Sequence, residues 1–337
     1  MSLTIENNLP IKIHSDQLTV EIAQPGSVYS GTRFDWTGFI TQVTLSTPGG
    51  GQHTFCVPES LEPGKGTGGW GLCNEFGNDK AIGYADAQPG ESFPKLGVGL
   101  LKRPEQPHYN FFLPHEINRQ FLIQIDTTEN QAVFTVDPIE CRGYAVRFTK
   151  TVCARENWME IVYRLENVGS KQIDTNEYCH NFMGIDEHHI GPEYRLHFPF
   201  TIQLEDIAAA YRHFLPPLLR KLLPSILQDK LLKRMAAPGN KVVKVKGGDF
   251  SFLATPQSPF YFRPLGFTKT DGYQWELTHL PSGVQMREYD DFTPCRIAVW
   301  GTTHVISAEI FVDINLNPGQ EKTWTRKYEF LAPTTTQ

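Results

Sequence analysis

Apolar and polar residues alternate with a period of two along much of the chain. In "GYAVRFTKTV" the side chains of Tyr144, Val146 and Phe148 share one face, and those of Arg147 and Thr149 share the other. The following "WMEIVYRLENVGS" alternates in the same way and ends on a turn signal. Together the two stretches predict an antiparallel hairpin joined through "CARENW".

Further alternating stretches are spread over the whole chain. "GFITQVTLS" and "NQAVFTVD" are typical of strands, and "KTWTRKYEF" places Trp324, Tyr328 and Phe330 on one face. Strands distributed in this way predict an all-β protein built as a large antiparallel sandwich. The sequence contains no internal repeat and no low-complexity linker, so we expect a single domain over residues 1–337.

One segment breaks the period of two. Residues 204–239 place leucines at spacings of three and four, which is the pattern of a helix. Pro216, Pro217 and Pro224 must divide or kink this segment, so we expect a helical insertion of two or more short helices. The simplest interpretation is a helical excursion packed on the sandwich. Its apolar and basic character leaves open a lid, a homodimer contact or a helix on a membrane surface.

Composition limits the class of protein. Of the 337 residues, 40% are hydrophobic and 20% are charged, so a large core can form. The net charge of -6 gives no reason to expect nucleic acid as a partner. We expect no integral membrane segment and no signal peptide, because long apolar runs are absent and "MSLTIENNLPIKIHSD" lacks a basic start. Six cysteines without a CxxC pair indicate reduced thiols in a cytoplasmic protein.

Polar residues gather in "TNEYCHNFMGID", residues 175–186, after an alternating stretch. His180 lies within it, and a neutral imidazole can both donate and accept a proton near pH 7. A lone histidine near a strand end is, however, more often a hydrogen-bonded structural group. Glu309 stands among small and apolar residues, where it is either a buried general base or an edge-strand residue that faces water.

Other motifs point to neither a metal nor an organic cofactor. In "IDEHH" the neighbouring His188 and His189 would point to opposite faces of a strand, so a solvated loop is the better interpretation than a metal site. The glycine-rich "TPGGGQHTF" and "GKGTGGWGL" lack the signature of a phosphate-binding loop. A nucleophile-elbow pattern is also absent from the sequence.

Three stretches resemble those of aldose 1-epimerases, members of the galactose mutarotase-like superfamily. "TNEYCHNF" is similar to the family segment in which Thr-Asn precedes a catalytic histidine. "AEIFVDINLNPGQEKTWTRKYEF" resembles the C-terminal run in which a catalytic glutamate leads into a Pro-Gly turn, and "GSVYSGTRFDWTGFITQVTL" resembles the opening strands. The resemblance implies a galactose mutarotase-like β-supersandwich, with a carbohydrate site on the concave face of one sheet.

The resemblance also implies a reaction. Interconverting the anomers of an aldose requires a base that takes the proton from the C1 hydroxyl and an acid that protonates the ring oxygen, on opposite sides of the sugar. Glu309 would be the base and His180 the acid. The family's early His-Gly-Gly segment has its nearest counterpart in "ESFPKLGVGLL", where Lys95 is present and histidine is not.

We expect further polar and aromatic side chains to bind the carbohydrate by hydrogen bonding and stacking. These candidates are Arg33, Asn74, Glu75, Lys95, Lys102, Asn181, Asp186 and Trp300. Two alternatives remain open on the same fold. One is a carbohydrate-binding protein without turnover, and the other is a different sugar enzyme, such as a sugar-phosphate epimerase or a lyase.

Overall fold

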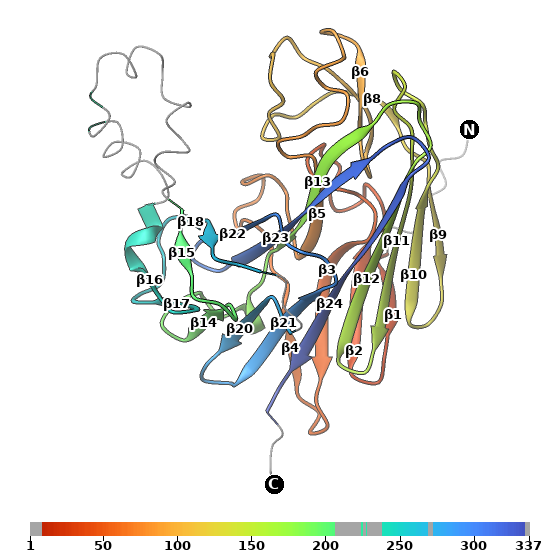
Figure 1. Ribbon diagram of the computed structural model, residues 1–337. Coiled ribbons are helices and arrows are strands. Elements are labelled where there is room, and N and C mark those ends of the chain that lie inside the picture. The colour runs from red at the N-terminus through yellow and green to blue at the C-terminus, as the bar shows by residue number, and fades with distance from the viewer. Residues whose placement is uncertain (1–8, 206–223, 225–226, 228–237, 269–271, 334–337) are drawn as a thin grey trace.

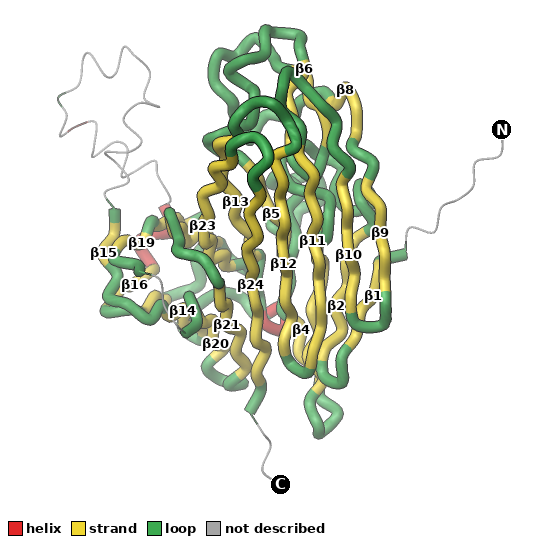
Figure 2. The backbone as a smooth tube through the Cα atoms, turned by 45° about the vertical axis from the view of Figure 1, so that its right-hand side comes forward, coloured by secondary structure: helices red, strands yellow, loops and turns green. Residues whose placement is uncertain are grey.

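The chain forms two large antiparallel sheets that pack face to face (Figure 1, Figure 2). The computed structural model describes residues 9–205, 224, 227, 238–268 and 272–333. Within these residues the regular structure is almost entirely β-strand, which confirms the all-β prediction. The largest cluster of buried apolar side chains draws on strands of both sheets.

The first sheet has nine strands in the described part of the chain. They are β1 (Ile11–His14), β2 (Leu18–Ala23), β3 (Phe39–Ser46), β4 (Gln52–Thr54), β5 (Leu72–Phe76), β13 (Ile173–Asn181), β18 (Phe260–Phe262), β22 (Arg296–Gly301) and β23 (Ile306–Leu316). Their order is β1-β2-β3-β5-β13-β23-β22-β18, and β4 pairs with β3. Strand β13 therefore lies in the middle of the sheet, between two strands from opposite ends of the sequence.

The second sheet has ten strands among the residues described. They are β9 (Ile123–Thr127), β10 (Gln131–Val136), β11 (Val146–Arg155), β12 (Trp158–Asn167), β14 (Tyr194–His197), β16 (Val243–Lys246), β17 (Asp249–Phe252), β20 (Trp275–His279), β21 (Val284–Asp290) and β24 (Glu321–Leu331). Their order is β16-β17-β14-β20-β21-β24-β12-β11-β10-β9. The predicted hairpin is confirmed as β11 and β12, whose strands extend into "CARENW" and leave a two-residue turn at Glu156 and Asn157.

Smaller elements complete the described structure. They are β6 (Ser92–Lys95), β7 (Gly99–Lys102) and β8 (Ile117–Gln120) in one small sheet, β15 (Gln203–Leu204) and β19 (Pro264–Leu265) in another, and the 3-10 helices η1 (Ile185–Glu187) and η3 (Pro238–Val242). Of the predicted helical insertion, Leu204 belongs to a strand and Gly239 to η3, and nearly all the rest lies outside the described residues. No helix in the described ranges is long and apolar enough to cross a membrane.

The two faces of most long strands differ in burial as the alternation predicts. On β12 the side chains of Met159, Ile161, Tyr163 and Leu165 are buried, and those between them are more exposed. Strand β13 is different, because its residues from Thr175 to Asn181 are all buried. One of its faces packs against the second sheet, and the other must be covered by something else.

Candidate functional site

Alternate side chains of strand β13 point to opposite faces of the first sheet and lie in two different environments. Glu177 and Asn181 point between the sheets, where they contact Arg326 and Tyr328 of β24. His180, which lies between them in register, therefore points to the opposite face, away from the second sheet. This face bears the candidate site.

A cavity of about 530 Å³ opens on that face of the first sheet. Pockets of roughly 300–1,000 Å³ are typical of small-molecule sites. Strands β13, β22 and β23 form its floor, and loops form its rim. Its aromatic lining consists of Phe111, Phe112, Tyr178, Phe182, Tyr261, Trp300 and Phe311. Its polar lining consists of Arg33, Glu59, Asn78, Asp79, His180, Arg263, Arg296 and Glu309.

The two residues expected to carry chemistry, His180 and Glu309, meet on the floor of this cavity. Nδ1 of His180 lies 2.8 Å from Oε1 of Glu309. Each residue is only 5% exposed. The contact brings together residues from β13 and β23, which are far apart in the sequence.

The strand register explains this meeting. Strands β13 and β23 pair from Ile173 with Leu316 to Tyr178 with Phe311. Continued by two residues, the same register sets His180 opposite Glu309. Directly opposed residues of an antiparallel pair project on the same face, so the two side chains share the cavity.

The contacts of His180 define its tautomer. Its Nε2 lies 2.8 Å from Nη2 of Arg33 and 2.8 Å from the hydroxyl oxygen of Tyr178. A guanidinium only donates hydrogen bonds, so Nε2 must accept, and the proton of a neutral imidazole then lies on Nδ1. That proton faces Glu309, although the short Nδ1 contact is not aligned as a good hydrogen bond.

Arg33 is held in place by a buried carboxylate. Its Nε donates to Oε2 of Glu75 at 2.8 Å, and its guanidinium stacks on Phe111 with its central carbon 4.7 Å from the ring centre. Burial is the largest influence and acts to raise the pKa of Glu75, but the positive charges of Arg33 and Lys95 and the hydrogen bond from Tyr178 together lower it. The hydroxyl of Tyr178 donates to the same Oε2 at 2.5 Å. Glu75 thus supports two side chains that contact Nε2 of His180.

The carboxylate of Glu309 keeps acceptor capacity for a ligand. Its Oε1 receives the Ser307 hydroxyl at 3.4 Å and faces His180. Its Oε2 has no hydrogen bond within the described part of the chain, and the side chain lines the cavity. A ligand hydroxyl entering the cavity can therefore donate to Oε2.

The other sequence-predicted binding residues divide into those at the cavity and those elsewhere. Arg33 and Trp300 line it, and Glu75 lies directly behind Arg33. Trp300 meets Phe182 edge-on, with the ring centres 5.8 Å apart.

Neither predicted lysine lines the cavity. Nζ of Lys95 donates to the carbonyl oxygen of Phe76 at 2.6 Å and to the hydroxyl of Tyr109 at 3.1 Å, and burial lowers the pKa of Lys95 to about 8. Lys102 is paired with Glu116 at 3.0 Å, where the two side chains are 44% and 65% exposed.

The remaining candidates have structural partners away from the cavity. Asn74 and Asn181 are fully buried between the sheets. Asp186 contacts Nδ1 of His53 at 2.7 Å and accepts a hydrogen bond from a backbone N–H. In the part of the chain that the structure describes, no group of three His, Cys, Asp or Glu side chains is arranged to hold a metal.

Several cavity residues were not singled out from the sequence. Tyr178 and Phe182 flank His180 at a spacing of two, and Phe311 follows Glu309 at the same spacing, so strand alternation could have identified them. Arg296 stacks on Phe311 with its central carbon 3.8 Å from the ring centre and pairs with Asp79 at 2.8 Å. No local motif marks this arginine.

Comparison with known proteins identifies the fold. No family model matches the chain, and no curated protein matches it in sequence. A galactose mutarotase related enzyme from Lactobacillus acidophilus is similar in structure, with a TM-score of 0.56, 10% identity, and coverage of 97% of this chain and 99% of that one. A GalM/aldose epimerase homologue from C. elegans has a TM-score of 0.56 at 11% identity and covers 96% and 99%.

A galactose mutarotase-like protein from Lactobacillus casei ATCC 334 is also similar. Its TM-score is 0.54 at 11% identity, and the alignment covers 96% of this chain and 100% of that one. These likenesses extend over nearly the whole of both chains. The protein described here therefore has the galactose mutarotase-like fold.

Proposed function

We propose that this protein is an aldose 1-epimerase-like enzyme that interconverts the anomers of a hexose or modified sugar. The observation that carries the proposal is the 2.8 Å contact between His180 and Glu309 on the floor of the 530 Å³ cavity. An imidazole and a carboxylate at one site supply the proton donor and the proton acceptor that the reaction needs. The fold supports a carbohydrate ligand by analogy.

The close contact changes the expected geometry of catalysis. Acid and base on opposite faces of the sugar would leave its ring between them, whereas here the two side chains touch. The anomeric oxygen and the ring oxygen are both bonded to C1, so a pair acting from one side can reach both. A substrate that enters beside the contact would place its anomeric hydroxyl on Glu309 and its ring oxygen near Nδ1 of His180.

Each proton and bond is then accounted for. Glu309 takes the proton of the anomeric hydroxyl, the C1–O1 bond becomes a carbonyl, and the bond from C1 to the ring oxygen breaks. His180 gives its Nδ1 proton to the released oxygen, and the resulting imidazolate-like charge is offset by Arg33 at Nε2. Rotation about C1–C2 and reversal of the steps close the ring in the other anomer.

The cavity wall suits a sugar with substituents. Trp300 and Phe182 offer apolar surfaces for the C–H faces of a pyranose. Arg263 and Arg296 add two guanidinium groups to the lining. Phosphorylated and acidic sugars therefore belong among the substrates to be tested.

One observation favours a carbohydrate-binding protein without turnover. Both ring nitrogens of His180 already contact protein groups, Nε2 with Arg33 and Tyr178 and Nδ1 with Glu309. If these contacts persist when a sugar binds, the imidazole has no free nitrogen to offer a substrate oxygen.

Exchange spectroscopy by NMR separates the two functions. Neutral, phosphorylated and acidic aldoses are mixed with the wild-type protein, and the rate of exchange between anomer signals is measured. The proposal expects faster exchange for at least one sugar and little acceleration by Glu309→Gln. A sugar whose signals shift or broaden on binding while anomer exchange stays at its uncatalysed rate would establish the binding protein instead.

A further inference from the structure

Strands β13 and β23 separate behind the candidate site. Their pairing stops after Tyr178 with Phe311 and returns only as an isolated bridge between Met183 and Ile306. Over the same stretch β13 stays paired with β5 and β23 stays paired with β22. The opening is therefore confined to the boundary where His180 faces Glu309.

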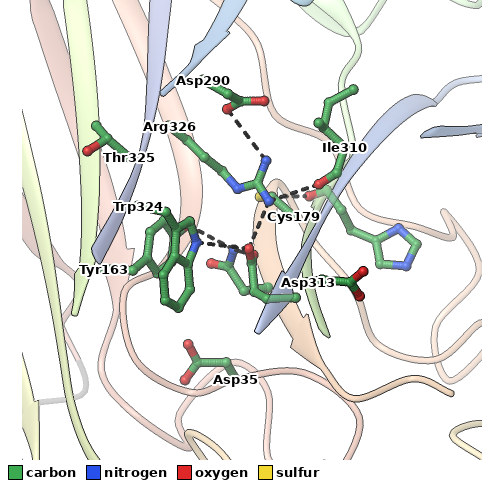
Figure 3. Close-up of polar contacts among 12 residues, drawn as sticks. Asp35, Tyr163, Cys179, Asp290, Ile310, Asp313, Trp324, Thr325 and Arg326 are labelled. Atoms are coloured by element: carbon green, nitrogen blue, oxygen red, sulfur yellow. Dashed lines mark hydrogen bonds and ion pairs between the residues drawn. The ribbon is translucent and has the colours of Figure 1, made fainter. Parts of the chain in front are cut away.

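Two side chains take the place of the missing backbone partners. Nδ2 of Asn181 donates to the carbonyl oxygen of Ala308 at 2.6 Å, and Nη2 of Arg326 donates to that of Ile310 at 2.8 Å. These carbonyls belong to the residues immediately before and after Glu309. Figure 3 shows the guanidinium of Arg326 reaching Ile310 on one side and Asp290 on the other.

A network that spans both sheets holds these two donors. Arg326, a residue of the second sheet, also donates to Glu177 at 2.8 Å and to Glu288 at 3.0 Å. Asn181 donates to Glu288 at 3.1 Å and accepts from the hydroxyl of Tyr328 at 3.1 Å. Arg326, Glu177, Glu288 and Asn181 have no exposed surface.

Stability alone is a poor explanation for this network. Burying an arginine among carboxylates costs desolvation that the ion pairs seldom exceed, and apolar side chains of similar volume are often as stabilising. Its donors reach the peptide groups on either side of Glu309, where the sheet has lost its own hydrogen bonds. The network is thus placed to fix the backbone that carries the carboxylate.

We propose that Asn181 and Arg326 are positioning residues, which hold β23 open from β13 and thereby set Glu309 against His180. The catalytic part of this inference rests on the proposed 1-epimerase function. The structural part concerns only the geometry of the His180–Glu309 pair. The two parts are tested by different measurements.

The first variant is Asn181→Leu, which removes the donor to Ala308 at similar volume and leaves Glu288 its bonds from Trp275 and Arg326. The second is Arg326→Met combined with Glu177→Gln, Glu288→Gln and Asp290→Asn, so that no carboxylate that contacts Arg326 is left without its arginine. Arg287→Met is the matched control, since Arg287 lies on β21 but pairs with Glu276 and Glu329 outside this network. Circular dichroism first establishes that each variant is folded.

In the folded variants we expect kcat to fall on the order of 10²-fold with KM little changed, the usual effect of a misplaced catalytic group. The ring ¹⁵N resonances of His180 should also shift in protein without sugar. Arg287→Met should alter neither quantity. Wild-type kcat together with unchanged His180 resonances in folded Asn181→Leu would overturn the proposal.

The resonance measurement also separates this proposal from the proposed function. If the wild type accelerates no sugar, the 1-epimerase function fails, and positioning is judged by NMR alone. It stands if the His180 resonances move in Asn181→Leu but not in Arg287→Met, and it fails if they move in neither. If the wild type is active, kcat and the resonances must change together.

Discussion

His180 and Glu309 face each other across the boundary between β13 and β23, in the register that pairs Tyr178 with Phe311 and Met183 with Ile306. Their side chains touch at 2.8 Å although the two backbones are not paired with each other at this point. The site is thus a cross-strand pair at an opening in a sheet. This arrangement fixes the relative placement of two groups more tightly than two loops would.

Removing either member of the pair should suppress anomer exchange. Glu309→Gln keeps shape and hydrogen bonding but cannot accept the proton, and His180→Asn keeps a polar side chain but cannot supply one. Each should lower kcat by about 10²–10⁴-fold with a much smaller change in KM. The double variant should be little worse than the worse single variant, because donor and acceptor act as one unit. Wild-type exchange by either folded variant would remove that residue from the mechanism.

Arg33 should stabilise the fold through Glu75. Arg33→Met leaves a buried carboxylate without its main partner, which should cost about 3–5 kcal/mol in the free energy of unfolding at pH 7. Arg33→Met with Glu75→Gln should recover most of this loss. Urea unfolding followed by fluorescence measures both variants, and equal losses in the two would contradict the assignment.

The loss of stability in Arg33→Met should also depend on pH. The lowered pKa of Glu75 contributes stability above the ordinary carboxyl pKa of about 4.3, and this contribution is lost as pH falls through the folded-state pKa. Without Arg33, burial would instead favour the protonated form. The deficit of Arg33→Met relative to wild type should therefore be greatest near neutral pH and should shrink towards pH ~4. A deficit that is constant over this range would argue against charge as its cause.

Asp290 should affect the pH dependence of stability in the direction opposite to Glu75. Burial and the nearby Glu288 raise the pKa of Asp290 well above its ordinary value. The folded protein then holds a proton that the unfolded chain releases above pH ~4, so this group lowers stability as pH rises. Asp290→Asn should be more favourable relative to wild type at pH 8 than at pH 5, as measured by urea unfolding. Asp126→Asn, on the exposed side of β9, is the control and should show no such trend.

Trp300 should contribute to binding of the sugar rather than to proton transfer. It lines the cavity and packs edge-on against Phe182. Trp300→Ala should raise KM by roughly tenfold, equivalent to about 1.4 kcal/mol, and leave kcat nearly unchanged. Trp158→Ala, on the second sheet beside Tyr289, is the matched control. A fall in kcat without a change in KM would show that Trp300 acts on the chemical step.

Much of the fold could be predicted because sheet faces impose a period of two. The hairpin of β11 and β12 and the strand β24 follow directly from alternation, since one face of each is buried and the other is more exposed. On β13 the same period relates Tyr178 and Phe182 to His180, but burial on both faces hides which of the two faces bears the site. His180 was therefore singled out, whereas its cavity neighbours Tyr178 and Phe182 were not.

The contacts that make up the site depend on pairing between distant strands. Neither the register that opposes His180 to Glu309 nor the link from Arg33 to Nε2 leaves a local sequence signal. Lys95 illustrates the converse difficulty. A lysine in a glycine-rich stretch suggests an exposed ligand contact, but its stem is buried and its ammonium group binds Phe76 and Tyr109.

The alternation of β13 ties the chemistry of this protein to its architecture. Because Glu177 and Asn181 face the interior and His180 between them faces the cavity, a slip of one residue would exchange the two sets of side chains. The imidazole would enter the space beside Arg326, and the interior carboxylate would face the ligand. An insertion or deletion within β13 would therefore disrupt the site rather than change its ligand specificity. New ligand specificity must instead arise in the loops at the rim of the cavity, whose lengths can vary without moving the interior-facing or the cavity-facing side chains of β13.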